Sequence, residues 1–284
     1  MCCLVHYRQR LSIRNGGKLF QGRDEGALRS LLTVLLTRRS LGQRFLSSDA
    51  IFNDPSNLSL CDQEVIARSR FTRQDLLIRT TRFGMDDWHP RHARQRRKVE
   101  MSENYIERCF VADWRRYFHH LSRTEFEFTP EAAEMLPPGA QTHFHLTDGD
   151  DAAYGYLASD GVVRKKRGGI VSSPGFVIFT RELWDGGPAG LSVFGMSGSL
   201  TYGFSHLIEH RFPAVLTLNE SEFVYCEISS DKSLIPSTEP SDAAFTRNWT
   251  VTVHRQGCDA TVYGPDSEPL LLHEAIPQPV APKF

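Results

Sequence analysis

The chain has few of the features that define specialised protein classes. Its six cysteines form no C-x-x-C pair, and a chain of 284 residues needs no disulfide staples, so reduced thiols are expected. The longest apolar stretch, Leu31–Leu36, is far shorter than the roughly 18 residues that indicate a membrane span. Net charge is only −1, so the total charge does not indicate a polyanionic partner. These absences favour a soluble cytoplasmic protein.

The charges are unevenly spread along the chain. Residues 1–100 contain 19 Lys and Arg against 10 Asp and Glu, whereas residues 101–284 contain 14 against 24. This asymmetry is typical of a basic arm on an acidic globular body. It predicts a basic, partly helical N-terminal region or extension over 1–100 and a globular domain over 101–284. An Arg-rich, acid-poor start is also typical of organelle-targeting presequences, so that location stays open.

The pattern after Met101 predicts an α+β domain. Apolar residues at helical spacing from Ile106 to Leu121 predict a helix capped by Ser102. Several strands, few helices and no regular alternation of the two favour an antiparallel-rich sheet. The predicted strands cover 142–147, 153–158, 162–170, 176–181, 191–194, 214–218, 223–228, 248–254, 260–263 and 269–273, and a further helix covers 199–210.

The most informative motif is the run from His206 to His210. These two histidines are four residues apart, so on a helix their imidazoles share one face and can bind one zinc ion. Glu209 lies beside them and can act as general base on a metal-bound water. The motif therefore predicts a zinc-dependent hydrolase. The alternative is an amphipathic helix end, with Leu207 and Ile208 in the core and the histidines near the negative helix terminus.

The segment Gly203–His210 resembles the H-x-x-E-H motif of pitrilysin-type metallopeptidases. The resemblance covers these eight residues and implies cleavage of a peptide or amide bond. In that family the third zinc ligand is a glutamate on a later helix. Here the 74 residues after His210 are predicted to form strands and loops, so no third ligand is carried over.

A second histidine pair, His143 and His145, alternates along a predicted strand. Alternate residues share one face of a strand, so both imidazoles can reach one ion. With Gly139, Asp150 and Gly155, the segment resembles in part the first metal motif of cupins, with aspartate in place of the usual glutamate. The alternative is a half-solvated strand followed by an acidic turn.

The two histidine pairs can also be combined. Catalytic zinc commonly has three protein ligands and one water. By residue type, His143 or His145 is the best candidate to complete a site with His206 and His210. This arrangement requires the strand to pack beside the helix, which the sequence does not fix.

A third candidate is the turn Gly195–Ser199, between a predicted buried strand and a helix. Backbone N–H groups in such a turn can hold an anion. Ser197 could act as a nucleophile, but the turn lacks the final glycine of the esterase elbow. The alternative is a tight strand-to-helix connection with Ser197 or Ser199 as N-cap.

The basic segment 91–98 is the last candidate. Its arginines can bind phosphate backbones through charge alone, with little sequence discrimination. The alternative is a solvated linker. The rival to the hydrolase hypothesis is therefore a non-catalytic binding or structural module whose basic N-terminal arm contacts a protein or nucleic-acid partner.

Overall fold

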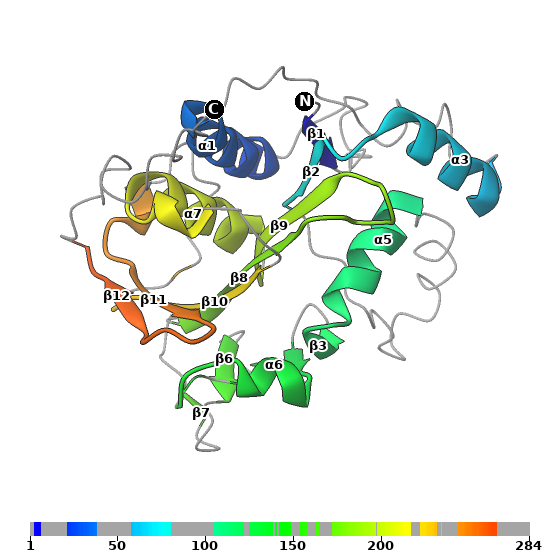
Figure 1. The fold of residues 1–284 in the computed structure, drawn as a ribbon. Helices are drawn as coiled ribbons and strands as arrows, with labels where there is room; N and C mark the ends of the chain where they lie inside the picture. The colour runs from blue at the N-terminus through cyan, green and yellow to red at the C-terminus, as the bar shows by residue number, and fades with distance from the viewer. Residues whose placement is uncertain are drawn as a thin grey trace, which may run out of the picture.

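A computed structural model shows how the chain folds (Figure 1). It describes residues 3–6, 22–38, 58–80, 105–121, 125–138, 140, 142–148, 154–157, 163–164, 172–196, 198–216, 222–231, 234 and 244–265. No helix within these segments is long and apolar enough to cross a membrane.

A seven-stranded mixed sheet forms the centre of the molecule, in the order β1-β2-β9-β8-β10-β11-β12. β1 pairs with β2 and β2 with β9 in parallel, and the other neighbours are antiparallel. The α+β fold with a mostly antiparallel sheet is confirmed. The strands are β1 Cys3–His6, β2 Leu76–Arg79, β8 Ser172–Thr180, β9 Ala189–Gly195, β10 Glu222–Ser229, β11 Thr250–Arg255 and β12 Thr261–Tyr263.

Two of these strands come from the basic N-terminal region. β1 and β2 lie at one end of the sheet, and β2 pairs along its whole length with β9. Leu77 and Ile78 are completely buried there. Residues before 101 therefore contribute to the same sheet as residues 172–263. The division of the chain into domains near residue 100 stays a prediction.

A second, five-stranded antiparallel sheet has the order β3-β4-β5-β6-β7. Its strands are β3 Phe118–Leu121, β4 Glu125–Phe128, β5 His143–Asp148, β6 Tyr154–Leu157 and β7 Val163–Arg164. Their short length fits a small sheet that depends on packing against a larger one.

Capping residues define where several helices begin. Ser59 accepts a hydrogen bond from the N–H of Asp62 and starts α3, and Thr129 caps α6 with Pro130 at its first position. The helices are α1 Gly22–Arg38, α3 Leu60–Arg70, α5 Tyr105–Trp114, α6 Pro130–Glu134 and α7 Gly198–His210, with 3-10 turns η3 Pro213–Leu216 and η4 Ala244–Thr246.

Two elements differ from their predicted form. The helix predicted to reach Leu121 ends at Trp114, and 118–121 instead form β3, paired with β4. The strand predicted over 214–218 is the 3-10 turn η3 as far as Leu216. The buried aromatic residues near β3 suit a helix or a strand, and pairing with the neighbouring strand β4 favours the strand.

Different layers cover the two faces of the seven-stranded sheet (Figure 1). On one, here called the helix face, a Cβ on Gly175 would lie 3.1 Å from the ring of Phe204 in α7. On the other, here called the aromatic face, Phe176, Phe194 and Tyr225 form one row of rings across three strands. This row packs against α5 and the second sheet.

Phe176 lies at the centre of the aromatic core. It is completely buried, and its ring meets those of Phe118 and Phe126 edge-on at centroid distances of 5.1 and 5.2 Å. Edge-to-face contacts of this kind add to the energy of burying apolar area. The packing of the second sheet on the first therefore depends on this ring.

Replacement of Phe176 by alanine should lower the free energy of unfolding by about 3–5 kcal/mol, because it leaves a cavity between the two sheets. Urea denaturation followed by tryptophan fluorescence measures the change. Val65→Ala is the control, since Val65 is 67% exposed and its loss should change stability by less than about 0.5 kcal/mol. Equal effects of the two variants would contradict this account of the core.

Gly203 allows α7 to approach the segment before β11. A Cβ at this position would lie 2.5 Å from the ring of Trp249 and 3.0 Å from Thr246. Trp249 is completely buried and has no space to move. A glycine inside a helix costs about 1 kcal/mol relative to alanine, so close packing explains its presence.

Gly203→Ala should therefore destabilise the protein, although alanine is the better helix former. The overlap with Trp249 should cost about 1–3 kcal/mol, which outweighs the gain in helix propensity. Gly26→Ala in α1 is the matched comparison, because the ring that it meets, Tyr202, is only half-buried and can shift. Thermal unfolding measures both; a higher melting temperature for Gly203→Ala would refute the packing argument.

Candidate functional site

The predicted histidine helix is present as α7. His206 and His210 lie on the same side of it, with ring centroids 4.3 Å apart and ring planes at 57°. Leu207 and Ile208 are buried at 1% and 0% exposure, so they face the core. The local geometry thus brings the two imidazoles together and also fits the interpretation as an amphipathic helix end.

Each of these histidines has a polar neighbour. Nδ1 of His206 lies 3.3 Å from Oγ1 of Thr246, which leaves Nε2 to face another group. Oε2 of Glu209 lies 3.6 Å from Nε2 of His210, whose side chain is 55% exposed. Among the described residues, no group of three or more His, Cys, Asp or Glu is placed to hold a metal ion. The zinc site stays a prediction that lacks a third ligand.

The other histidine pair lies in a different layer. His143 and His145 belong to β5, where they pair with Glu127 and Glu125 of β4. β4 packs on the aromatic face of the seven-stranded sheet, whereas α7 covers the helix face. β4, the neighbour of β5, therefore lies on the other side of the large sheet from α7, and a site that joins the two pairs stays a prediction. The side chains of His143 and His145 lie outside the described residues.

Arg211, directly after α7, fixes the helix end. Its guanidinium donates to the backbone carbonyls of Thr246, Arg247, Trp249 and Gly264. Hydrogen bonds from a charged donor contribute about 1.5–3 kcal/mol each. This cation therefore ties η4 and the end of β12 to α7.

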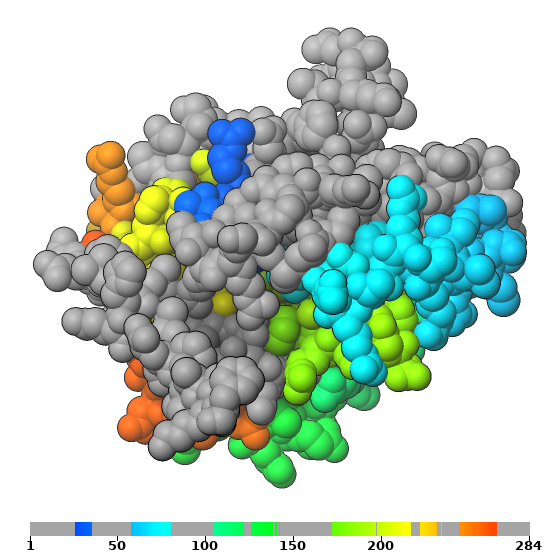
Figure 2. All heavy atoms as spheres, turned by 45° about the horizontal axis from the view of Figure 1, so that its top comes forward, coloured from blue at the N-terminus to red at the C-terminus, as the bar shows by residue number. Residues whose placement is uncertain are grey.

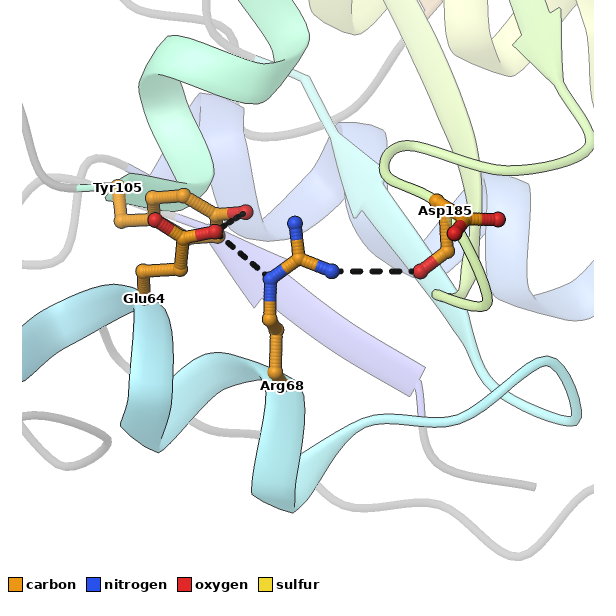
Figure 3. Close-up of polar contacts among 4 residues, drawn as sticks. All are labelled: Glu64, Arg68, Tyr105 and Asp185. Atoms are coloured by element: carbon orange, nitrogen blue, oxygen red, sulfur yellow. Dashed lines mark hydrogen bonds and ion pairs between the residues drawn. The ribbon is translucent and has the colours of Figure 1, made fainter. Parts of the chain in front are cut away.

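A polar cluster joins α3, α5 and the loop before β9 (Figure 3). Glu64 accepts hydrogen bonds from Nε of Arg68 at 2.7 Å and from the hydroxyl of Tyr105 at 3.4 Å, and Arg68 donates to the carbonyl of Asp185 at 3.3 Å. Burial raises the pKa of Tyr105 and raises the pKa of the neighbouring Cys109 to about 11. Both groups are neutral near pH 7, so the cluster connects elements and offers no activated nucleophile.

The carboxyl edge of the parallel strands β1, β2 and β9 is a further candidate site. After β9 the chain enters α7 on the helix face, whereas the first described element after β2 is α5. α5 lies on the aromatic face, where the ring of Trp114 is 5.0 Å from that of Phe194. In α/β sheets, ligands usually bind at the carboxyl ends of two neighbouring parallel strands that are followed by segments on opposite faces of the sheet.

α1 and α7 lie side by side, as the blue and yellow segments show (Figures 1 and 2). Gly26 of α1 closely approaches the ring of Tyr202 in α7. α1 also contacts η3, which follows the end of α7.

A short turn connects β9 with α7. The N–H of Gly195 donates to Oγ1 of Thr201 at 3.0 Å, which closes the turn. The first turn of α7 contains no acidic residue, so the positive end of its dipole has no carboxylate within the helix. Ser197 lies outside the described residues, and its role as N-cap or nucleophile stays a prediction.

Two buried polar residues end β2 at this edge. Arg79 is completely buried on the aromatic face, with its guanidinium carbon 4.9 Å from the ring centroid of Trp114. Thr80 is 1% exposed, and its Oγ1 makes no hydrogen bond within the described part of the chain. An unpaired buried hydroxyl costs about 1–3 kcal/mol. Thr80 is therefore a polar group that a ligand can satisfy.

The sequence does not predict Arg79 and Thr80 as site residues. They are more than a hundred positions from β9, and strand pairing alone brings Arg79 beside Ser192 of that strand. A weak signal exists in the apolar segment Leu76–Ile78, which has the uniform hydrophobicity of a strand buried on both faces. The basic segment 91–98 lies outside the described residues, so the nucleic-acid hypothesis stays a prediction.

No protein family model, curated protein or solved structure matches this chain. Its function therefore has to be inferred from its own geometry.

Proposed function

We propose that the chain binds a small soluble molecule at the carboxyl edge of β1, β2 and β9. One observation carries the proposal: β2 and β9 are parallel neighbours, and the next described elements after them, α5 and α7, lie on opposite faces of the sheet. The two covering layers diverge at such an edge and leave backbone groups that a ligand can contact. This is a specific form of the hypothesis of a non-catalytic binding module.

The groups gathered at the edge support this proposal. Thr80 contributes a buried hydroxyl, and α7 begins with a turn that contains no acidic residue. A site of this kind combines apolar walls with a few polar groups that orient the ligand. Met196 and Leu200, at 7% and 0% exposure, are buried apolar residues beside the turn.

Thermal-shift screening of the full chain tests the proposal. The probes are nucleosides, nucleotides, sugars and sugar phosphates, and a ligand present at about 100 times its Kd should stabilise the fold by about 2.7 kcal/mol. Hydrogen exchange should then show protection of the peptides that contain Thr80 and Gly195–Thr201. A panel without any binder, or protection confined to other segments, would refute the proposal.

A second candidate function is zinc-dependent hydrolysis at His206 and His210, with Glu209 as general base. The specific observation in its favour is the 4.3 Å ring separation together with the contact of His206 Nδ1 to Thr246. A partner on Nδ1 orients the ring so that Nε2 can bind a metal. The substrate suggested by the motif is a peptide or amide bond.

Zinc uptake tests this second candidate. Equilibrium dialysis followed by elemental analysis should find about one zinc per chain in the parent protein, and none in the double variant His206→Ala, His210→Ala. Glu209→Gln should retain the metal and lose hydrolysis, because it removes the base and keeps the shape. Parent protein that stays folded in chelator and takes up no zinc would exclude the site.

A further inference from the structure

We propose that the outer face of the five-stranded sheet binds a divalent transition-metal ion such as zinc through His120 of β3, Glu127 of β4 and His143 of β5. The outer face is the one directed away from the seven-stranded sheet. This site is separate from the ligand edge at β2 and β9 and from the histidines of α7. Strand pairing and the chemistry of the three residues support it.

Strand pairing places the three residues in one row across the sheet. His120 pairs with Glu127, and Glu127 pairs on its other side with His143. Residues directly opposite each other in antiparallel strands share a face, with Cβ atoms about 4.5–5.5 Å apart. Because neighbouring strands are about 4.8 Å apart, the backbones of the two histidines are about 10 Å apart with the glutamate between them. Two imidazoles that flank a carboxylate in this way can share one ion.

The row belongs to the face that points away from the large sheet. Phe126 and Phe128, on either side of Glu127, both pack against the ring of Phe176. Alternation along β4 therefore turns Glu127 to the opposite face. Glu127 is exposed, so an ion from solution can reach its carboxylate.

A β-bulge lies directly beside this row. The pairing of β3 with β4 shifts between Phe118 and His120, so His119 is an extra residue between these pairs. His119 is exposed. Bulges re-aim side chains and are frequent next to functional sites. The irregularity therefore brings a further imidazole to the part of the sheet that contains Glu127.

The strands of this row contain no basic residue that could pair with the glutamate. Neither lysine nor arginine occurs in β3, β4 or β5. Opposite charges directly across a sheet stabilise it, but histidines occupy these positions on both sides of Glu127. His145 likewise pairs with Glu125. A neutral imidazole does not compensate the charge of a carboxylate, whereas a metal ion bound by both does.

The donor set suits zinc and similar ions. Imidazole nitrogen and carboxylate oxygen are among the ligands that these ions prefer, and three protein ligands leave a position for water. The structure describes the side chains of His120 and Glu127 but not that of His143, so this set of three is not among the described groups. An ion bound here connects three short strands and should stabilise the sheet.

Zinc uptake by the variant His206→Ala, His210→Ala tests the inference, because this variant lacks the histidines of α7. Equilibrium dialysis of the tag-free full chain followed by elemental analysis should find about one zinc per chain. The further substitutions His120→Ala and His143→Ala should remove this zinc. Circular dichroism checks that both variants are folded.

Glu127→Gln provides a second readout that keeps the size of the side chain. Loss of this ligand should weaken zinc binding by about 10–100-fold, at least as much as loss of an outer-shell partner does. Glu131→Gln is the matched control, because Glu131 is exposed on α6, directly after β4, and its substitution changes the net charge equally. The control should leave zinc binding unchanged. Bound zinc should also protect the peptides of β3, β4 and β5 from hydrogen exchange.

The outcomes separate this site from the other candidates. Zinc that remains without the histidines of α7 and disappears without His120 and His143 would support the inference. A variant without the α7 histidines that takes up no zinc would overturn it and favour the site on α7. Equal zinc affinity of Glu127→Gln and Glu131→Gln would overturn it as adventitious binding by surface histidines. Binding of organic probes at the carboxyl edge is a separate measurement, so failure here leaves that proposal intact.

Discussion

The pairing of β2 with β9 is the contact on which the rest of the arrangement depends. It joins two strands that are more than a hundred residues apart, and it buries Leu77 and Ile78 completely. β9 is followed by α7, which belongs to the helical layer, and the first described element after β2 is α5, which belongs to the aromatic layer. The pairing of β2 with β9 therefore lies where the two layers begin. The same contact places Arg79 beside Ser192 of β9.

Burial on both faces constrains the central strands. β8 and β9 are buried along nearly their whole length, which requires apolar side chains on the helix face as well as on the aromatic face. The aromatic face is filled by large rings around Phe176, and the helix face by α7, which approaches closely at Gly175 and Gly203. Small residues on the helix face and large rings on the aromatic face thus set the distances between the large sheet and the layers that cover it.

The two candidate sites lie at opposite ends of α7 and use opposite ends of its dipole. The start of the helix carries the positive end of the dipole, which favours an anion, whereas the end carries His206 and His210, where positive charge is favoured. Arg211 already brings a cation to that end and is bound by four carbonyls. A metal ion there would add to this charge, whereas an anion at the start meets no competing carboxylate within the helix.

The sequence by itself determined the local features of the fold. The caps at Ser59 and Thr129, the helix that carries His206 and His210, and the central strands follow from spacing and residue type within a few positions. The tertiary structure alone decided the rest. Residues 118–121 form β3 instead of a helix, β5 and α7 lie on opposite faces of the large sheet, and Arg79 lies beside Ser192. Periodicity and caps act between near neighbours, whereas strand pairing between distant segments depends on the packing energy of the whole core.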